Sequence, residues 1–186
     1  MASASPRRKE LLEQIGLQFE VEPSNYDEGI VAGSEPHETA RRLSIGKARA
    51  AGEDHPNALI IAADTFVVIG DRILGKPHTD SEAREMLRAL NGQAHSVITG
   101  FTILDTETGK VLSRSVETRV HMRKLTLKEI DSYIKSKEPL DKAGGYAIQG
   151  LGAVLVERIE GDYSNVVGLP LSALAESLRE FGVKVL

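Results

Sequence analysis

The sequence predicts an α/β fold with a mixed β-sheet for a chain of 186 residues. Helix-like and strand-like segments alternate along the chain, which is the pattern of this class. Residues 58–63 form a continuous apolar run, as expected of a strand buried on both faces. Ser/Thr-x-x-Glu patterns at Thr79 and Thr126 mark the starts of two helices. Because no repeat or linker interrupts the chain, we expect one domain over residues 1–186.

Local signals predict the individual elements in chain order. Ser5 fits a helix N-cap, Pro6 the first helical position and Gly16 the stop. We then expect a strand at 19–21, an acidic loop at 25–36, a helix at 38–51, strands at 58–63, 66–69 and 72–74, and a helix from 79 to 91. The second half should contain a hairpin of strands 96–104 and 111–122, a helix at 126–135, a strand at 153–159, an extended piece at 163–167 and a helix at 171–181.

Composition excludes several classes of function. The formal net charge is −4 and no basic run is present, which disfavours binding to a nucleic acid polymer. The chain has no cysteine, and hence no disulfide and no thiolate nucleophile. The five histidines include no pair at ligand spacing, so a histidine metal site or a Ser-His-Asp triad has little support. No apolar run reaches membrane-spanning length, and we expect a cytoplasmic protein without a membrane partner.

Residues 141–150 indicate a phosphate-binding loop. Glycines at this point allow backbone N–H groups to approach an anion closely, and Lys142 adds a positive charge. A flexible hairpin connector is the simpler alternative. A turn between strands needs far less glycine, so we favour the phosphate site.

A second cationic feature lies at the start of the first expected helix. Unpaired N–H groups and the positive end of the helix dipole favour an anion there. Arg7 and Arg8 occupy the first turn, where the dipole favours Asp or Glu, so they oppose helix stability unless an anion neutralises them. Two solvated surface arginines are the alternative to phosphate recognition.

Asp64 is the candidate catalytic carboxylate. It directly follows the apolar run, and open α/β sheets place ligand sites at the carboxyl ends of strands. Asp64 could act as general base for water, as a metal ligand, or as both through one bound water. Alternatively, Asp64 and Thr65 cap a turn. Two carboxylates, a hard divalent cation and several Lys or Arg groups would suit attack on a phosphoanhydride.

Three further charged residues are each typical of a solvated surface when taken alone. Glu28 lies in the acidic loop, and Lys47 projects from the second expected helix. Lys76 lies in the tripeptide Gly-Lys-Pro at 75–77. Neither a Ser or Thr nor a helix follows Lys76, so a P-loop is excluded.

Five motifs occur in order over almost the whole chain. They are Ser-x-Ser-Pro-Arg-Arg at 3–8, Ala-Asp-Thr at 63–65, Gly-Lys-Pro at 75–77, Asp-Lys-Ala-Gly-Gly-Tyr-Ala-Ile-Gln-Gly at 141–150 and Gly-Asp-Tyr-Ser-Asn-Val-Val-Gly-Leu-Pro at 161–170. In these motifs the chain resembles the Maf family of nucleoside triphosphate pyrophosphatases. The resemblance implies an elongated mixed-sheet fold like that of the inosine triphosphate pyrophosphatases, with two lobes around a cleft, and a homodimer. It also implies hydrolysis of a nucleoside triphosphate to monophosphate and pyrophosphate with a divalent cation, Mg²⁺ or Mn²⁺.

The resemblance assigns roles to particular residues. Asp64 looks like the proton acceptor that activates water, and Glu28 looks like a second carboxylate on the metal side. The residues that match positions near the phosphates are Ser5, Arg7, Arg8, Lys47, Lys76 and Lys142. Arg7, Thr65 and Gln149 match the branch that acts on dTTP and UTP, whereas the 7-methyl-GTP branch differs at these positions. Gln149 can donate and accept toward a base edge, which suits discrimination between substrates.

Two alternatives stay open at this stage. The chain could be a nucleotide-binding regulator of septum formation with little turnover, or it could run the same reaction on modified nucleotides. The sequence also departs from the family at its start, because the family has an apolar opening strand before its first Ser and this chain begins Met1-Ala2-Ser3. Either the start codon is misassigned or the first strand is very short, and we expect loss of that strand to loosen the loop of Arg7 and Arg8 and to reduce stability or activity.

Overall fold

The computed structural model describes residues 1–24, 26 and 35–186. Glu28 and most of the expected acidic loop therefore lie outside the described residues. The chain divides into two compact units. Unit 1 comprises residues 1–64, 99–116 and 168–186, and unit 2 comprises residues 65–98 and 117–167.

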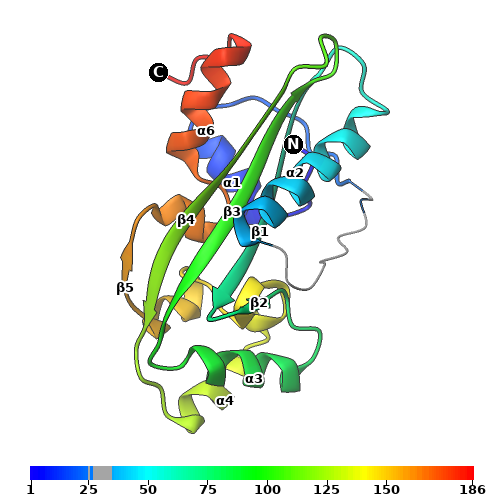
Figure 1. The fold of residues 1–186 in the computed structure, drawn as a ribbon. Coiled ribbons are helices and arrows are strands. Elements are labelled where there is room, and N and C mark those ends of the chain that lie inside the picture. Colours follow the sequence, from blue (N-terminus) through cyan, green and yellow to red (C-terminus); the bar gives the residue numbers. More distant parts are fainter. Residues whose placement is uncertain (25, 27–34) are drawn as a thin grey trace. The chain divides into compact units, whose positions relative to one another are not determined.

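Helices and strands follow one another in an α/β order (Figure 1). The α-helices are α1 (Pro6–Gln14), α2 (Pro36–Gly52), α3 (Asp80–Leu90), α4 (Leu127–Lys135), α5 (Tyr163–Val167) and α6 (Leu171–Leu178). The strands are β1 (Leu59–Ile69), β2 (Arg72–Leu74), β3 (Ala94–Asp105), β4 (Val111–Met122) and β5 (Val156–Glu160). Short 3₁₀ turns are η1 (Glu138–Asp141), η2 (Ala143–Gly145), η3 (Gly150–Leu155) and η4 (Arg179–Phe181).

In unit 1, α2 packs closely against β3. Gly100 permits this approach, because a Cβ atom there would lie 2.2 Å from the Ala40 carbonyl oxygen. The hydroxyls of Ser44 and Thr102 hydrogen bond at 2.7 Å between the same two elements. One apolar cluster of this unit consists of Ala2, Ala48, Ala51, Ile60, Ala62 and Leu104. This packing holds the C-terminal half of α2 beside β1.

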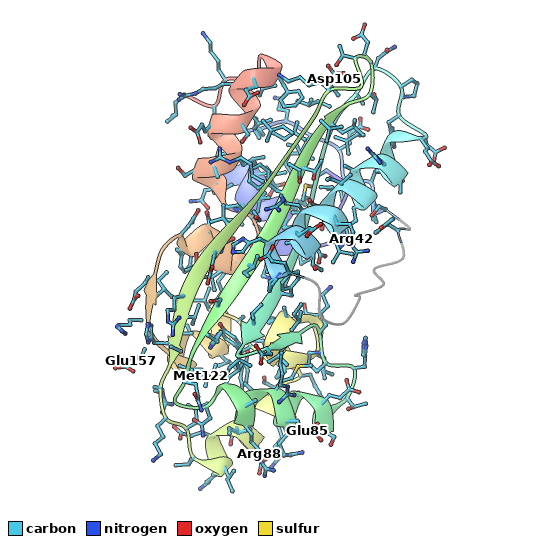
Figure 2. All side chains as sticks on the ribbon, in the orientation of Figure 1. Arg42, Glu85, Arg88, Asp105, Met122 and Glu157 are labelled. Carbon is cyan, nitrogen blue, oxygen red and sulfur yellow. The ribbon has the colours of Figure 1, made fainter. Side chains whose placement is uncertain are left out.

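In unit 2, capping side chains begin α3 and α4. Thr126 and Glu129 form a complete capping box at α4. At α3, the Thr79 hydroxyl accepts the Glu82 N–H at 3.1 Å, while the Glu82 carboxylate accepts from the N–H of His78. The core of unit 2 packs both helices on the sheet residues; it contains Val67, Leu74, Ala83, Leu87, Leu90, Val97, Val120, Met122, Leu125, Ile130, Tyr133, Ile134, Tyr146 and Leu155. Figure 2 shows Met122, a member of this core, at the end of β4.

A five-stranded sheet in the order β2-β1-β3-β4-β5 confirms the α/β class predicted from the sequence. Pairing among the described strands is antiparallel, with Val68 of β1 opposite Ile73 of β2 and Val120 of β4 opposite Ile159 of β5. The mixed sheet predicted from the sequence would have both parallel and antiparallel pairs. The expectation fails because apolar periodicity reports burial and not strand direction. The predicted hairpin of β3 and β4 is confirmed.

Four local predictions differ from the structure. The strands expected at 58–63 and 66–69 are one continuous strand, β1, so Asp64 and Thr65 lie within a strand and neither end a strand nor cap a turn. Residues 163–167, expected to be extended, form α5, because Asp162 Oδ1 accepts the N–H groups of Ser164 and Asn165 and caps a helix start. The strand expected at 153–159 begins at Val156, after the 3₁₀ turn η3. No strand is assigned at 19–21, yet the Glu22 N–H donates to the Met1 carbonyl at 3.0 Å.

The expected helices at 38–51, 79–91, 126–135 and 171–181 are confirmed with small shifts at their ends. Within the described ranges, no helix has the length and apolar character needed to cross a membrane.

Candidate active site

A buried ion pair links Asp64 of β1 to Lys47 of α2. Lys47 Nζ donates to Asp64 Oδ1, and the two residues are 7% and 9% exposed. The fully buried Ala62 and Ala63 precede Asp64 and fix the backbone of β1 at this point. The sequence around Lys47 is typical of a solvated surface lysine. In the structure, the packing of α2 instead places its ammonium group in contact with the Asp64 carboxylate, the predicted catalytic group.

The start of α1 contributes a second part of unit 1. Ser5 is the N-cap residue and Pro6 the first helical residue, as predicted, but the Ser5 side chain makes no capping hydrogen bond. Arg8 Nε donates to the Gly168 carbonyl at 2.8 Å, and its Nη1 donates to Ser3 Oγ at 3.1 Å. Arg7 is half-buried beside it. Arg8 thus joins the first motif to the last one.

In unit 2, the two lysine-bearing loops lie side by side. The Gly144 N–H donates to the Gly75 carbonyl at 2.9 Å, which connects the glycine-rich loop to the Gly-Lys-Pro segment. Lys142 Nζ donates to the Glu138 carbonyl at 2.8 Å and to Asp141 Oδ1 at 2.6 Å. Lys76 is exposed. The loops therefore bring two cationic side chains onto one part of this unit.

Gln149 and Thr65 also belong to unit 2, and both are half-buried. Thr65 follows Asp64 directly and begins this unit. Gln149 has an extended backbone, with φ −108° and ψ 170°, just before η3. Sequence reasoning missed Glu138 and Tyr133, whose side chains hold the backbone on both sides of Gln149.

A buried His95–Tyr146 pair anchors the glycine-rich loop to β3, and it was also missed. The Tyr146 hydroxyl and His95 Nε2 lie 2.6 Å apart, and the rings meet edge to face. Burial lowers the pKa of His95 to about 4 and raises the pKa of Tyr146 above its ordinary value. Both groups are therefore neutral near pH 7. A histidine alone on a strand carries no local signal for this contact.

The predicted site residues come from both units. Unit 1 contains Ser5, Arg7, Arg8, Lys47 and Asp64, and unit 2 contains Thr65, Lys76, Lys142 and Gln149. Glu28 lies outside the described residues. Among the residues that the structure describes, no group of three or more His, Cys, Asp or Glu side chains could hold a metal ion.

The structure thus defines an α/β protein with a buried Asp–Lys pair at a strand, an arginine-bearing helix start and a glycine-rich lysine loop. The family described as Maf-like protein matches residues 1–181. The chain belongs to the Maf family.

Curated relatives match over almost their whole length. A dTTP/UTP pyrophosphatase of Methanosarcina mazei is 48% identical, covering 100% of this chain and 94% of its own. A dTTP/UTP pyrophosphatase of Syntrophus aciditrophicus is 46% identical over 98% of this chain and 89% of its own. The solved structure of the Staphylococcus aureus Ham1 protein matches 83% of this chain and 77% of that chain, at 14% identity and a TM-score of 0.46.

Proposed function

We propose that this chain is a hydrolase that converts dTTP and UTP to the monophosphate and pyrophosphate. The observation that carries the proposal is the buried Asp64 carboxylate, held by Lys47, in a chain 46–48% identical to proteins named dTTP/UTP pyrophosphatase. A pure nucleotide binder would have no need for a desolvated carboxylate fixed by a lysine, since burying charges costs free energy.

In the proposed reaction, the Asp64 carboxylate accepts a proton from the attacking water. Lys47 donates to Oδ1 and so fixes the carboxylate plane, which leaves Oδ2 as the acceptor for that proton. The water oxygen forms a bond to the α-phosphorus. The bond between that phosphorus and the oxygen bridging the α and β phosphates breaks. The products are the nucleoside monophosphate and pyrophosphate. Lys47 thus acts on the reaction by orienting Asp64, in addition to its expected place near the phosphates.

The remaining cationic groups are proposed to bind the triphosphate. Arg7 and Arg8 would act with the Ser5 hydroxyl and the N–H groups at the start of α1. Lys76 and Lys142 would act from the two connected loops of unit 2. Arg groups suit bidentate contacts with phosphate, whereas Lys groups act as point charges. Arg7, Thr65 and Gln149 are proposed to select the pyrimidine nucleotide.

A hard divalent cation, Mg²⁺ or Mn²⁺, is proposed as the cofactor. Mg²⁺ is commonly held by one or two carboxylates together with substrate phosphate oxygens and waters. Asp64 supplies one such carboxylate among the described residues, and Glu28 is proposed as the second. A cation bound there would neutralise charge on the phosphates.

We also propose that the protein acts as a homodimer, which light scattering on the purified chain would test directly. A monomer at micromolar concentration would contradict this part of the proposal without affecting the proposed reaction.

The reaction is tested with purified protein and Mg²⁺ or Mn²⁺ against dTTP, UTP, CTP, GTP, ATP and 7-methyl-GTP. Pyrophosphate and orthophosphate are measured separately. We expect pyrophosphate from dTTP and UTP, and none from Asp64→Asn, which should still bind dTTP by calorimetry. Asp54→Asn is the matched control, because Asp54 is an exposed carboxylate of the same unit. Orthophosphate as the first product, or full turnover by Asp64→Asn, would contradict the proposal.

A further inference from the structure

Two side chains hold the backbone on either side of Gln149. The Ala147 N–H donates to Tyr133 Oη at 3.2 Å on one side. On the other side, Glu138 Oε2 accepts the Leu151 N–H at 3.1 Å and Glu138 Oε1 accepts the Gly152 N–H at 3.0 Å. The Tyr133 hydroxyl itself donates to Glu138 Oε1 at 2.9 Å, so the two halves form one network. We call this network the 133/138 clamp.

The clamp is built into the fold of unit 2. Tyr133 lies on α4 and is 5% exposed, and Glu138 begins η1, the next element after that helix. Burial, with the Glu138 carboxylate next, raises the pKa of the Tyr133 hydroxyl above its ordinary value. The hydroxyl therefore keeps its proton and can donate to Glu138 while it accepts from Ala147. All members of the clamp belong to the same unit.

Glycines in the loop allow the backbone to approach the clamp. A Cβ atom at Gly150 would lie 2.9 Å from Glu138 Oε2, and Gly150 has φ +63°. A Cβ atom at Gly152 would lie 2.2 Å from the Ala147 carbonyl oxygen and 2.7 Å from the Tyr133 hydroxyl oxygen. Larger residues at either position would move the loop away from Glu138 and Tyr133. The glycines thus serve the contact with the clamp as well as the turn.

We infer that Glu138 and Tyr133 are positioning residues for Gln149, and that they set the preference for uracil-type over cytosine-type bases. This inference rests on the proposed function, because it takes Gln149 as the residue that contacts the base. An amide can both donate and accept, so it distinguishes two base edges only when it is held at one position and orientation. The clamp fixes the backbone within two residues of Gln149 on both sides, and so fixes the position from which the amide reaches the base.

The test measures kcat and KM for UTP and CTP in Glu138→Gln and Tyr133→Phe. Glu138→Gln replaces an accepting oxygen by an NH₂ group, which cannot accept from a backbone N–H. Tyr133→Phe removes the partner of the Ala147 N–H. We expect the UTP/CTP ratio of kcat/KM to fall about tenfold in each, mainly through KM for UTP, since the loss is close to that of one hydrogen bond. Glu85→Gln, the same change at an exposed site on α3 of the same unit, should leave the ratio unchanged (Figure 2).

A double variant separates positioning from general loss of stability. In Gln149→Ala the UTP/CTP ratio of kcat/KM should already be low, and adding Glu138→Gln should not lower this ratio further. A uniform loss of activity on both substrates, in proportion to a lower melting temperature, would overturn the inference, and so would additive effects in the double variant. Failure of the wild type to release pyrophosphate from UTP would instead refute the proposed function, so the two failures are distinguishable.

Discussion

Lys47 Nζ donates to Asp64 Oδ1, and the two side chains are only 9% and 12% exposed. In water such a pair contributes little, but taking one partner away from a buried pair leaves the other charge desolvated. Lys47 therefore orients the proposed catalytic carboxylate and also contributes to the free energy of unfolding. This double role makes the pair the first target for mutation.

Lys47→Met is expected to lower the free energy of unfolding by about 3 kcal/mol, because it leaves Asp64 buried without its charge partner. Urea unfolding measures this change. Adding Asp64→Asn should recover part of the loss, since the lone carboxylate is then gone. Lys184→Met, at an exposed lysine of the same unit, should change stability by less than about 0.5 kcal/mol. An unchanged urea midpoint for Lys47→Met would contradict the prediction.

Arg8→Lys is expected to destabilise unit 1 by about 1 kcal/mol, because one ammonium cannot replace a guanidinium that bonds in two directions. Arg8 reaches the Gly168 carbonyl and Ser3 Oγ from different nitrogens. Urea unfolding is again the measurement. Arg88→Lys, at an exposed position on α3 (Figure 2), is the control and should unfold as the wild type does. Equal midpoints for the two variants would show that the Arg8 contacts contribute no net stability.

Helix starts are the part of this fold that the sequence predicts best. Capping signals are local, so Ser5, Thr79 and Thr126 mark α1, α3 and α4 directly. The error at 163–167 has another origin: the apolar residues there suggested an extended segment, whereas the capping side chain of Asp162 starts a helix. Strand direction in the sheet depends on the path of the whole chain, which periodicity does not encode.

Local sequence signals predict some residues of the candidate site, whereas the role of others depends on long-range packing. Asp64 is recognisable because it ends an apolar run, and the glycine-rich loop is recognisable by composition. Lys47 is 17 residues from Asp64 and lies on another element, so its contact with the carboxylate depends on the packing of α2. Tyr133 and Glu138 precede the loop and resemble ordinary helix and turn residues. Their role becomes visible only through the hydrogen bonds that they make.

Acid is expected to destabilise unit 2 through His95. Burial lowers its pKa to about 4 from an ordinary value of 6.5. Between these pH values the unfolded chain binds a proton that the folded chain excludes, so the free energy of unfolding falls as pH decreases. It is unaffected by His95 above about pH 6.5, and the full loss near pH 4 is about 3 kcal/mol.

Urea unfolding at pH 7 and pH 5 tests this dependence on His95. In His95→Gln the titrating group is gone while an acceptor for Tyr146 remains, so the difference between the two pH values should shrink. His78→Gln changes an exposed histidine and should keep the wild-type difference. An identical pH dependence in His95→Gln and the wild type would mean that other groups cause the acid sensitivity.

Gly144→Ala is expected to cost more stability than Gly109→Ala, although both glycines have nearly the same backbone conformation. Their φ angles are +70° and +71°, so the left-handed backbone conformation lowers the free energy of unfolding of an alanine variant by about 1 kcal/mol at either site. At Gly109 nothing lies within 4 Å of the new Cβ atom, whereas at Gly144 it would lie 2.9 Å from Val67 Cγ2. Val67 is buried in the core of unit 2, and overpacking there raises the total to about 3 kcal/mol.

Urea unfolding of both variants measures this difference, and steady-state kinetics with UTP measures its effect on the loop. Displacement of Gly144 should weaken its N–H bond to the Gly75 carbonyl and shift Lys142 and Lys76 relative to each other. KM for UTP should therefore rise in Gly144→Ala and stay at the wild-type value in Gly109→Ala. Equal losses of stability in the two variants would show that the loop adjusts freely against Val67, and that the fixed backbone proposed for phosphate binding does not depend on this glycine.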